Sequence, residues 1–179
     1  MELNFKIEQI AICPSDPQAA IKLLTAMGAA EWVKDLVVAK GVVYPEPQAL
    51  SRKVDGPTEE VNVARLAFNY DMNPGKNLEF EVLNYAAGDN WMARQPNTAS
   101  HLGMHCGASE LAHWKAFFKR QRIPIAQEVH TQSHSNPAVA GIRFYHYCIF
   151  DTRPILGIDI KFIVRKDVDV GGAGGSPFE

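Results

Sequence analysis

Polar and ionisable side chains recur at alternate positions in short, otherwise apolar segments of this chain. They are Gln9 in the first segment, Glu79 and Glu81 in the second, His101 and His105 in the third, and Asp159 and Lys161 in the fourth. Carboxylate oxygens, amide oxygens and imidazole nitrogens can bind metal ions, and carboxylates and imidazoles can also act as general acids or bases. A lysine ammonium can neutralise a carboxylate or a negatively charged ligand.

These roles depend on which face of each strand is buried. Successive side chains of a strand point to opposite faces, so Glu79 and Glu81 share one face while Phe80 and Val82 share the other. A strand of this kind normally turns its polar face to water. If the sheet curls and its apolar face packs under helices, the polar face instead lines a cavity, and its residues become candidate ligands. The alternation alone leaves both alternatives open.

Local signals predict the elements that position these residues. Alternation over residues 4–12 predicts a strand, and Ser15 or Asp16 can cap a helix that begins at Pro17 and stops at Gly28. Further strands are expected at about 31–44, 61–71 and 77–85, with loops at 45–60 and 86–99 and a turn over residues 71–76.

The same order of elements recurs in the second half of the chain. The two copies start 92 residues apart, at Gln9 and His101, and Ser109 is expected to cap a second helix. The expected elements are strands at about 100–106, 123–130, 141–151 and 156–165, the helix at about 110–121, and a loop over His130–Pro137. The order therefore predicts an α+β fold of two βαβββ modules in one chain, with curved mixed sheets around a shared cavity.

This organisation divides the chain into four parts. They are a first module at 1–86, a linker at 87–99, a second module at 100–166 and a flexible tail at 167–179. The two helices are expected to cover the outer sheet faces with the apolar side chains of Leu23, Leu24, Trp114 and Phe117.

Composition restricts the classes of function. The 179 residues carry a formal net charge of -2, which argues against a strongly basic nucleic-acid-binding protein. No apolar run approaches the ~18 residues of a membrane span, and no signal-peptide core is present, so a cytoplasmic protein without a membrane partner is expected. Cys13, Cys106 and Cys148 form no disulfide or zinc pattern and are expected to be buried thiols.

Four sequence segments resemble the vicinal oxygen chelate superfamily, which includes glyoxalase I, bleomycin-resistance proteins and extradiol dioxygenases. The segments IEQIAICPSDPQAAIKLLTAMG and SHLGMHCGASELAHWKAFFKRQRIPI resemble the starts of its two modules. The segments LEFEVLNY and LGIDIKFIVR resemble the strands that end each module. The resemblance covers roughly residues 5–165.

The resemblance implies a divalent-metal site with one ligand from the first and last strand of each module. Matched by position, three of these ligands are Gln9, Glu81 and His101. The fourth should be a glutamate four residues after a glycine, but Lys161 follows Gly157 at that spacing. An ammonium has no lone pair to offer a metal ion and repels it electrostatically.

This departure leaves three alternatives, given in order of preference. The site holds no metal and Lys161 neutralises Glu81, or a divalent ion such as Zn²⁺, Ni²⁺, Mn²⁺ or Fe²⁺ is bound by Gln9, Glu81, His101 and water. In the third, Asp159 replaces the missing glutamate from two positions away. An extradiol dioxygenase site needs two histidines and one glutamate, of which only His101 is found.

The preferred function is a glyoxalase- or bleomycin-resistance-like protein that binds a small polar or aromatic molecule in its central cavity. Glu81, His101, Lys161 and Arg143 would fix that molecule. The alternative is a divalent-metal-dependent lyase, isomerase or dioxygenase-type enzyme. A third reading is a metal-free enzyme in which Glu81 or His101 is a general base and Lys161 stabilises charge, so the resemblance leaves open whether the protein is an enzyme. It also allows a homodimer.

The remaining histidines have simpler interpretations. His105 lies ~13 Å along the strand from His101, too far to share one ion easily. The run from Glu128 to His134 could bind a metal ion, but a solvated loop is the more ordinary interpretation. His146 is expected to be an interior histidine with its hydrogen bonds satisfied.

Overall fold

The computed structural model describes residues 3–29, 32–43, 61–69, 78–84, 100–132 and 141–168. The elements in the first half are β1 (Gln9–Ile12), α1 (Pro17–Ala26), β2 (Val33–Val43), β3 (Val61–Asn69) and β4 (Glu79–Asn84). Those in the second half are β5 (His101–His105), α2 (Ala108–Arg120), β6 (Ile125–Gln132), β7 (Arg143–Phe150), α3 (Arg153–Leu156) and β8 (Asp159–Asp167). The molecule is therefore α+β, as predicted.

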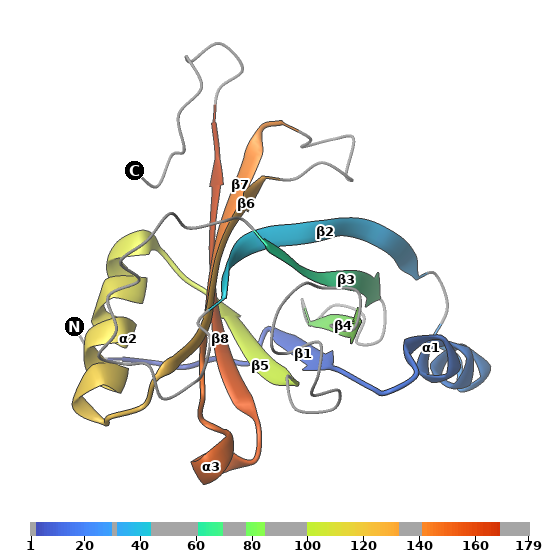
Figure 1. The fold of residues 1–179 in the computed structure, drawn as a ribbon, viewed down its shortest axis with the longest axis horizontal. Coiled ribbons are helices and arrows are strands. Elements are labelled where there is room, and N and C mark those ends of the chain that lie inside the picture. The colour runs from blue at the N-terminus through green and yellow to red at the C-terminus, as the bar shows by residue number, and fades with distance from the viewer. Residues whose placement is uncertain are drawn as a thin grey trace.

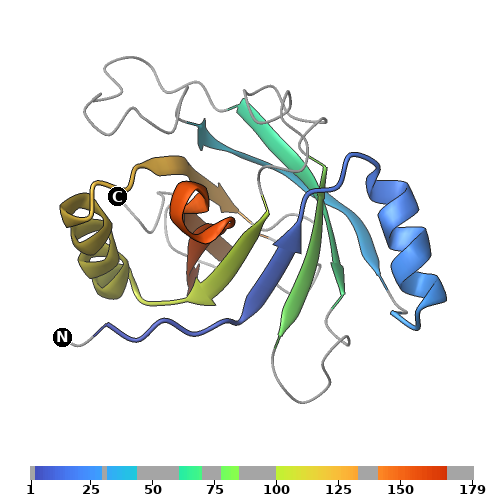
Figure 2. The same ribbon diagram turned by 90° about the horizontal axis from the view of Figure 1, so that it is seen from below.

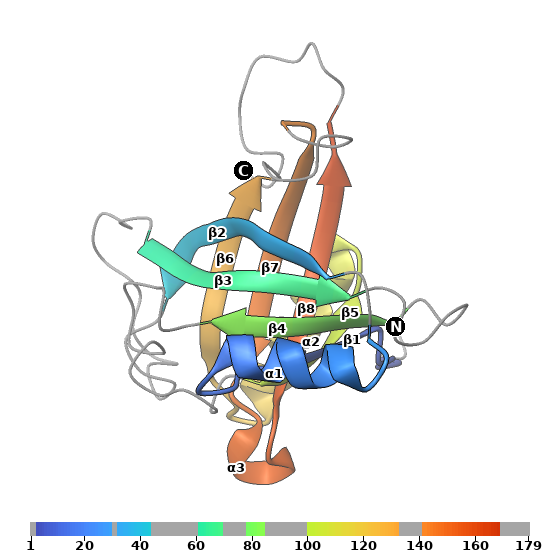
Figure 3. The same cartoon turned by 90° about the vertical axis from the view of Figure 1, so that its right-hand side faces the viewer.

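The strands form a closed ring in the order β1-β4-β3-β2-β6-β7-β8-β5. The pairs β1–β4 and β5–β8 are parallel, and the other neighbours are antiparallel, so the sheet is mixed. Strands β2, β3 and β4 run crosswise to β6, β7 and β8, as Figures 1 and 3 show. The expected division into two modules and a shared cavity stays a prediction.

Helix α1 begins and ends where local chemistry predicts. The Asp16 carboxylate accepts a hydrogen bond from the backbone N–H of Ala19 at 2.9 Å, and Pro17 begins the helix. Gly28 follows the helix with a φ of +104°, a conformation that glycine adopts without a steric penalty. The side chain of Ile21 is buried, whereas that of Leu23 is 63% exposed, so the expectation that Leu23 packs on the sheet is wrong.

Helix α2 packs more extensively on the sheet than α1. Its side chains Leu111, Trp114 and Phe118 are buried in one apolar cluster with residues of β7 and β8. Trp114 stacks on Phe162, with ring centroids 4.8 Å apart. The helix is capped by the extended backbone of Gly107 without a side-chain hydrogen bond, so the Ser109 cap prediction is wrong. Figure 2 shows α1 and α2 on opposite sides of the strand ring.

Several expected boundaries differ from the structure. The short helix α3 was not expected; Gly157 ends it in a left-handed conformation with a φ of +75°. Strand β6 continues to Gln132, so His130 lies in a strand rather than in a loop. Strand β8 continues to Asp167, the first residue of the expected tail.

The cysteines agree in part with expectation. The described cysteines form no disulfide, and Cys13 and Cys148 are buried. Cys106 is only half-buried, because it follows the end of β5 at the edge of the α2 cluster. Burial, followed by the charges of Glu110 and Glu8, raises the pKa of the Cys106 thiol to about 12, so it is protonated at neutral pH.

Some predictions fall on residues outside the described ranges. They are the loops at 45–60 and 86–99, the linker at 87–99, the turn over residues 71–76, most of the His130–Pro137 loop, and the tail from residue 169. Within the described residues, no helix is long and apolar enough to cross a membrane.

Candidate functional site

Contacts with the helices identify the outer face of the strands. Val82 of β4 packs with Ile21 of α1, and Phe162 of β8 packs with Trp114 of α2. Because neighbouring side chains of a strand point to opposite faces, the residues next to Val82 and Phe162 point into the strand ring. Glu81 and Lys161 occupy such positions.

Of the two alternatives that the alternation left open, the buried one holds for most of these polar residues. Glu81 and Asp159 are 0% exposed and Lys161 is 6% exposed, while Glu79 is half-buried. Ionised side chains are almost never this buried without a partner. Their burial makes the inner face of the ring the candidate functional site.

Strands β1 and β5 bring the two halves of the chain together. They pair antiparallel, with Gln9 opposite Gly103 and Ala11 opposite His101. The imidazole Nε2 of His101 lies 3.0 Å from Oε1 of Gln9, although the residues are 92 positions apart. A Cβ atom on Gly103 would lie only 2.9 Å from Cβ of Gln9, so glycine at this position leaves room for the Gln9 side chain.

The parallel pairs place Lys161 in the position that corresponds to Glu81. On β4, Glu81 is opposite Ala11, two residues after Gln9 on β1. On β8, Lys161 is opposite Gly103, two residues after His101 on β5. Lys161 in the second half of the chain therefore occupies the position that Glu81 occupies in the first half, just as His101 corresponds to Gln9.

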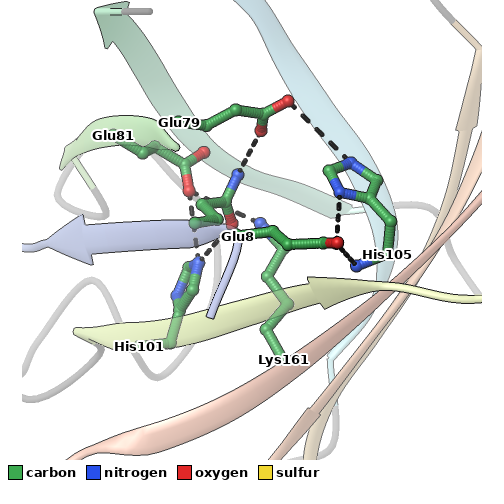
Figure 4. A network of polar contacts seen from close by, with 7 residues as sticks. Glu8, Glu79, Glu81, His101, His105 and Lys161 are labelled. Carbon is green, nitrogen blue, oxygen red and sulfur yellow. Dashed lines mark hydrogen bonds and ion pairs between the residues drawn. The ribbon is translucent and has the colours of Figure 1, made fainter. Parts of the chain in front are cut away.

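The four expected site residues meet in one buried network. Oε2 of Glu81 lies 3.2 Å from Nε2 of His101 and 3.4 Å from Nζ of Lys161. The Lys161 ammonium also lies 4.6 Å from the ring centroid of Tyr147 on β7, close enough for a cation–π interaction. Figure 4 shows Glu81, His101 and Lys161 pointing toward one another from three strands. These contacts bring the four residues together, while their roles stay predictions.

Glu81 is the electrostatic centre of this network. Burial by itself would raise the pKa of Glu81, but the charge of Lys161 and the hydrogen bond from His101 outweigh it and hold the pKa below its ordinary value. Glu81 is therefore ionised at neutral pH. Its second oxygen, Oε1, is buried and has no hydrogen-bond partner within the described residues.

Solved structures with a similar fold support the resemblance seen in the sequence. A Streptomyces coelicolor methylmalonyl-CoA epimerase variant in complex with 2-nitronate-propionyl-CoA is 11% identical, with a TM-score of 0.50 over 90% of this chain and 98% of that chain. A second variant of that enzyme is also 11% identical, with a TM-score of 0.50 over 97% of this chain and all of the other. This chain has the vicinal oxygen chelate fold.

Other comparisons add little to that assignment. The hypothetical protein BH1468 from Bacillus halodurans is 10% identical, with a TM-score of 0.49 over 95% of this chain and 98% of that chain. No protein-family model and no curated protein matches the sequence. The structural similarity at 11% identity shows the fold and assigns no chemistry to this chain.

The interior of this vicinal oxygen chelate fold does not fit a divalent metal ion. Both neighbours of His101 Nε2, an oxygen of Gln9 and an oxygen of Glu81, are hydrogen-bond acceptors, so Nε2 carries the proton and offers no lone pair there. The position at which the resemblance implies a fourth ligand holds the Lys161 ammonium, which already neutralises Glu81. Both features favour the first of the three alternatives, in which no metal is bound.

Glu79, which was not expected to be a ligand, orients the side chain of Gln9. Nε2 of Gln9 donates a 3.0 Å hydrogen bond to Oε2 of Glu79, which directs the amide oxygen of Gln9 toward His101. The other oxygen of Glu79 lies 3.8 Å from Nε2 of His105, and Nδ1 of His105 lies 3.2 Å from Glu8 (Figure 4). The shared strand face of His101 and His105 is the signal that could have found this extension.

Asp159 does not replace the missing glutamate in this arrangement. Its Oδ1 lies 3.3 Å from Nε of Arg153, at the start of α3. Burial raises the pKa of Asp159 to about 7; the charge of Arg153 opposes this shift and the charge of Asp151 adds to it. Arg143 donates two hydrogen bonds of 2.6 and 2.7 Å to Asp167, and its role in fixing a ligand stays a prediction.

The raised pKa of Asp159 predicts a loss of stability as the pH rises. The pKa of an aspartate in an unfolded chain is ~3.9, whereas the pKa of Asp159 in the folded protein is about 7. Between these values the folded state binds more protons, so the free energy of unfolding falls as pH rises, and the whole penalty is present above pH ~7. Asp159→Asn should remove this penalty. In urea unfolding, the free energy of unfolding of Asp159→Asn minus that of wild type should be larger at pH ~8 than at pH ~5 by roughly 2–3 kcal/mol. An equal difference at both pH values would show that Asp159 does not titrate in this range.

Proposed function

We propose that the protein binds a small polar or aromatic molecule inside the strand ring, beside Glu81 and Lys161, without a divalent metal ion. The observation that carries this proposal is the buried ammonium of Lys161, 3.4 Å from Glu81 at the position corresponding to a metal ligand. A fixed lysine cation supplies a positive charge without metal coordination.

The surroundings of Glu81 indicate what such a molecule would contain. The buried oxygen Oε1 of Glu81 has no hydrogen-bond partner in the described part of the chain, and leaving a buried acceptor unpaired costs about 1–3 kcal/mol. A hydroxyl or amine group on the ligand would donate to this oxygen. The ring of Tyr147, beside Lys161, suits an aromatic group.

The structural comparison gives this proposal independent support. The Streptomyces coelicolor methylmalonyl-CoA epimerase with the same fold was solved in complex with 2-nitronate-propionyl-CoA. A small molecule bound to that protein is consistent with a small-molecule ligand here.

A divalent-metal-dependent lyase, isomerase or dioxygenase-type enzyme is the second candidate. One observation favours it: Nε2 of His101 lies 3.0 Å from an oxygen of Gln9 and 3.2 Å from an oxygen of Glu81. Two ligands that each lie ~2.1 Å from one metal ion are about this far apart. Metal binding at these residues would require deprotonation of His101 Nε2 and displacement of the Lys161 ammonium.

Nuclear magnetic resonance titration distinguishes the two candidates. Phenol, aniline and benzylamine should cause saturable shifts of the amide signals of Glu81, His101 and Lys161. Anisole and N,N-dimethylaniline lack a donor and should bind at least ~10-fold more weakly, since a donor to a buried carboxylate contributes about 1.5–3 kcal/mol. Glu81→Gln should weaken binding of the donor probes, while the control Glu110→Gln on α2 should not.

Two outcomes would contradict the proposed function. Failure of every donor-bearing probe to shift these signals would exclude the proposed ligand chemistry. Tight, stoichiometric Zn²⁺ or Mn²⁺ binding by wild type that is lost in both Glu81→Gln and His101→Ala would overturn the metal-free proposal and favour the metal-dependent candidate. Because a homodimer is also compatible with this fold, light scattering should accompany each titration.

A further inference from the structure

A second cluster of metal-ligating side chains lies on the opposite face of the sheet from the interior network. On β6 and β7, His130 is paired directly with His146, and Glu128 is paired with Cys148. Cys148 packs in the apolar cluster beneath α2, so these side chains point to the outer face. Tyr147, the neighbour of His146, lies instead beside the interior residue Lys161.

The outer cluster, defined as Glu128, His130 and His146, has the composition of a transition-metal site. Its ligand atoms, one from each residue, all lie within 4.8 Å of one another; among the described residues no other trio of His, Cys, Asp or Glu is that compact. Nε2 of His146 lies 2.6 Å from Oε1 of Glu128. The imidazole rings of His130 and His146 are stacked, with centroids 4.0 Å apart.

Side chains of the outer cluster would have to move closer together to bind an ion. Zn²⁺ lies about 2.0–2.2 Å from imidazole nitrogens and carboxylate oxygens and is almost always tetrahedral, so its ligand atoms lie roughly 3.4 Å apart. The ligand atoms of the outer cluster lie within 4.8 Å of one another, so the largest separation would have to shrink by up to about 1.4 Å. His130 is exposed, which leaves room for its ring to move, while Glu128 and His146 are half-buried and already in contact at 2.6 Å.

We propose that the outer cluster is a binding site for a late first-row divalent cation, such as Cu²⁺ or Zn²⁺, separate from the interior network. Two imidazoles and one carboxylate favour such ions over Mg²⁺ or Ca²⁺, which prefer oxygen ligands. The ion would join β6 to β7 beside α2, and water would complete its coordination.

Lys115 of α2 sets the strength of this site. Its ammonium forms an ion pair with Oε1 of Glu128, the same oxygen that lies beside His146. When no metal ion is bound, Lys115 holds the carboxylate of Glu128 in place. When a metal ion is present, Lys115 competes with it for this carboxylate. Lys115→Met should therefore raise the affinity for Cu²⁺ or Zn²⁺ several-fold, because it removes a competing positive charge.

Titration of untagged, chelator-treated protein with Cu²⁺ or Zn²⁺ alone tests the site. His130→Ala and His146→Ala should each weaken binding at least ~10-fold, because loss of even a residue that only hydrogen-bonds a metal ligand weakens binding about 10–100-fold. His113→Ala is the matched control, because this exposed histidine of α2 bonds to the carbonyl of Ser109 and lies outside the cluster. It should leave the affinity unchanged.

Electron paramagnetic resonance of the Cu²⁺ complex identifies which site is filled. The outer cluster supplies two imidazole nitrogens, and His130→Ala should reduce this number to one; the interior network supplies only His101. Glu81→Gln should leave the two-nitrogen spectrum intact, so this result does not depend on the proposed interior function. Absence of binding, or binding unaffected by both His130→Ala and His146→Ala, would overturn the proposal.

Discussion

Changing Lys161 to glutamate is expected to turn the interior network into a tight binding site for divalent metal ions. The change replaces a positive charge beside Glu81 by a negative one, and it supplies the carboxylate that the resemblance implies at this position. The interaction energy of two unit charges ~4 Å apart is about 4 kcal/mol at an effective dielectric constant of ~20. Since ~1.4 kcal/mol corresponds to a tenfold change, Zn²⁺ affinity should rise at least ~100-fold even after a large allowance for solvation.

Calorimetric titration with Zn²⁺ measures this effect directly. Wild type and Lys161→Glu should be compared in a His130→Ala background, which removes the outer cluster from the measurement. Lys161→Met is the matched control, because it removes the positive charge without adding a ligand, and its affinity should lie between the other two. Equal affinity of all three proteins would show that residue 161 does not control metal binding inside the ring.

Removing Glu81 alone is expected to destabilise the fold severely, whereas removing Glu81 and Lys161 together should not. Glu81→Leu leaves the 6%-exposed Lys161 without its carboxylate partner. Breaking a buried ion pair on one side costs about 3–5 kcal/mol, while replacing both partners by apolar residues of similar size is often neutral or stabilising. Glu81→Leu/Lys161→Met should therefore recover most of the stability lost in Glu81→Leu.

Urea unfolding of wild type, both single variants and the double variant completes a double-mutant cycle. A favourable coupling free energy above ~1 kcal/mol is expected, because the two charges are in contact and screened little by water. Additive effects of the two substitutions would mean that the 3.4 Å contact contributes nothing measurable to stability. The His113→Ala protein serves as a surface control and should unfold like wild type.

The sequence predicted best those features that depend on neighbouring residues. The start and end of α1 follow from Asp16, Pro17 and Gly28, whose side-chain hydrogen bond, fixed φ and left-handed φ are all local properties. Ser109 misled the prediction for α2, because a cap also needs an extended backbone, and the structure has that backbone at Gly107.

The candidate residues of the interior site were also readable from the sequence, but their surroundings were not. Alternation showed that Glu81 shares a face with Glu79, and Lys161 with Asp159, yet it is equally compatible with a solvated face. Packing of α1 and α2 on the apolar faces decided that Glu81 and Lys161 are buried. Burial of this kind depends on contacts between distant parts of the chain.

Sequence alone therefore determined which residues could do chemistry, and the order of the strands and of helices α1 and α2 around them. Only the tertiary structure decided that Lys161 contacts Glu81 across 80 positions, and that Glu128, His130 and His146 form a cluster on the outer face. The physical reason is that strand register and ring closure depend on backbone hydrogen bonds between segments far apart in sequence. A shift of one residue in any of these pairings would turn the side chains to the opposite face.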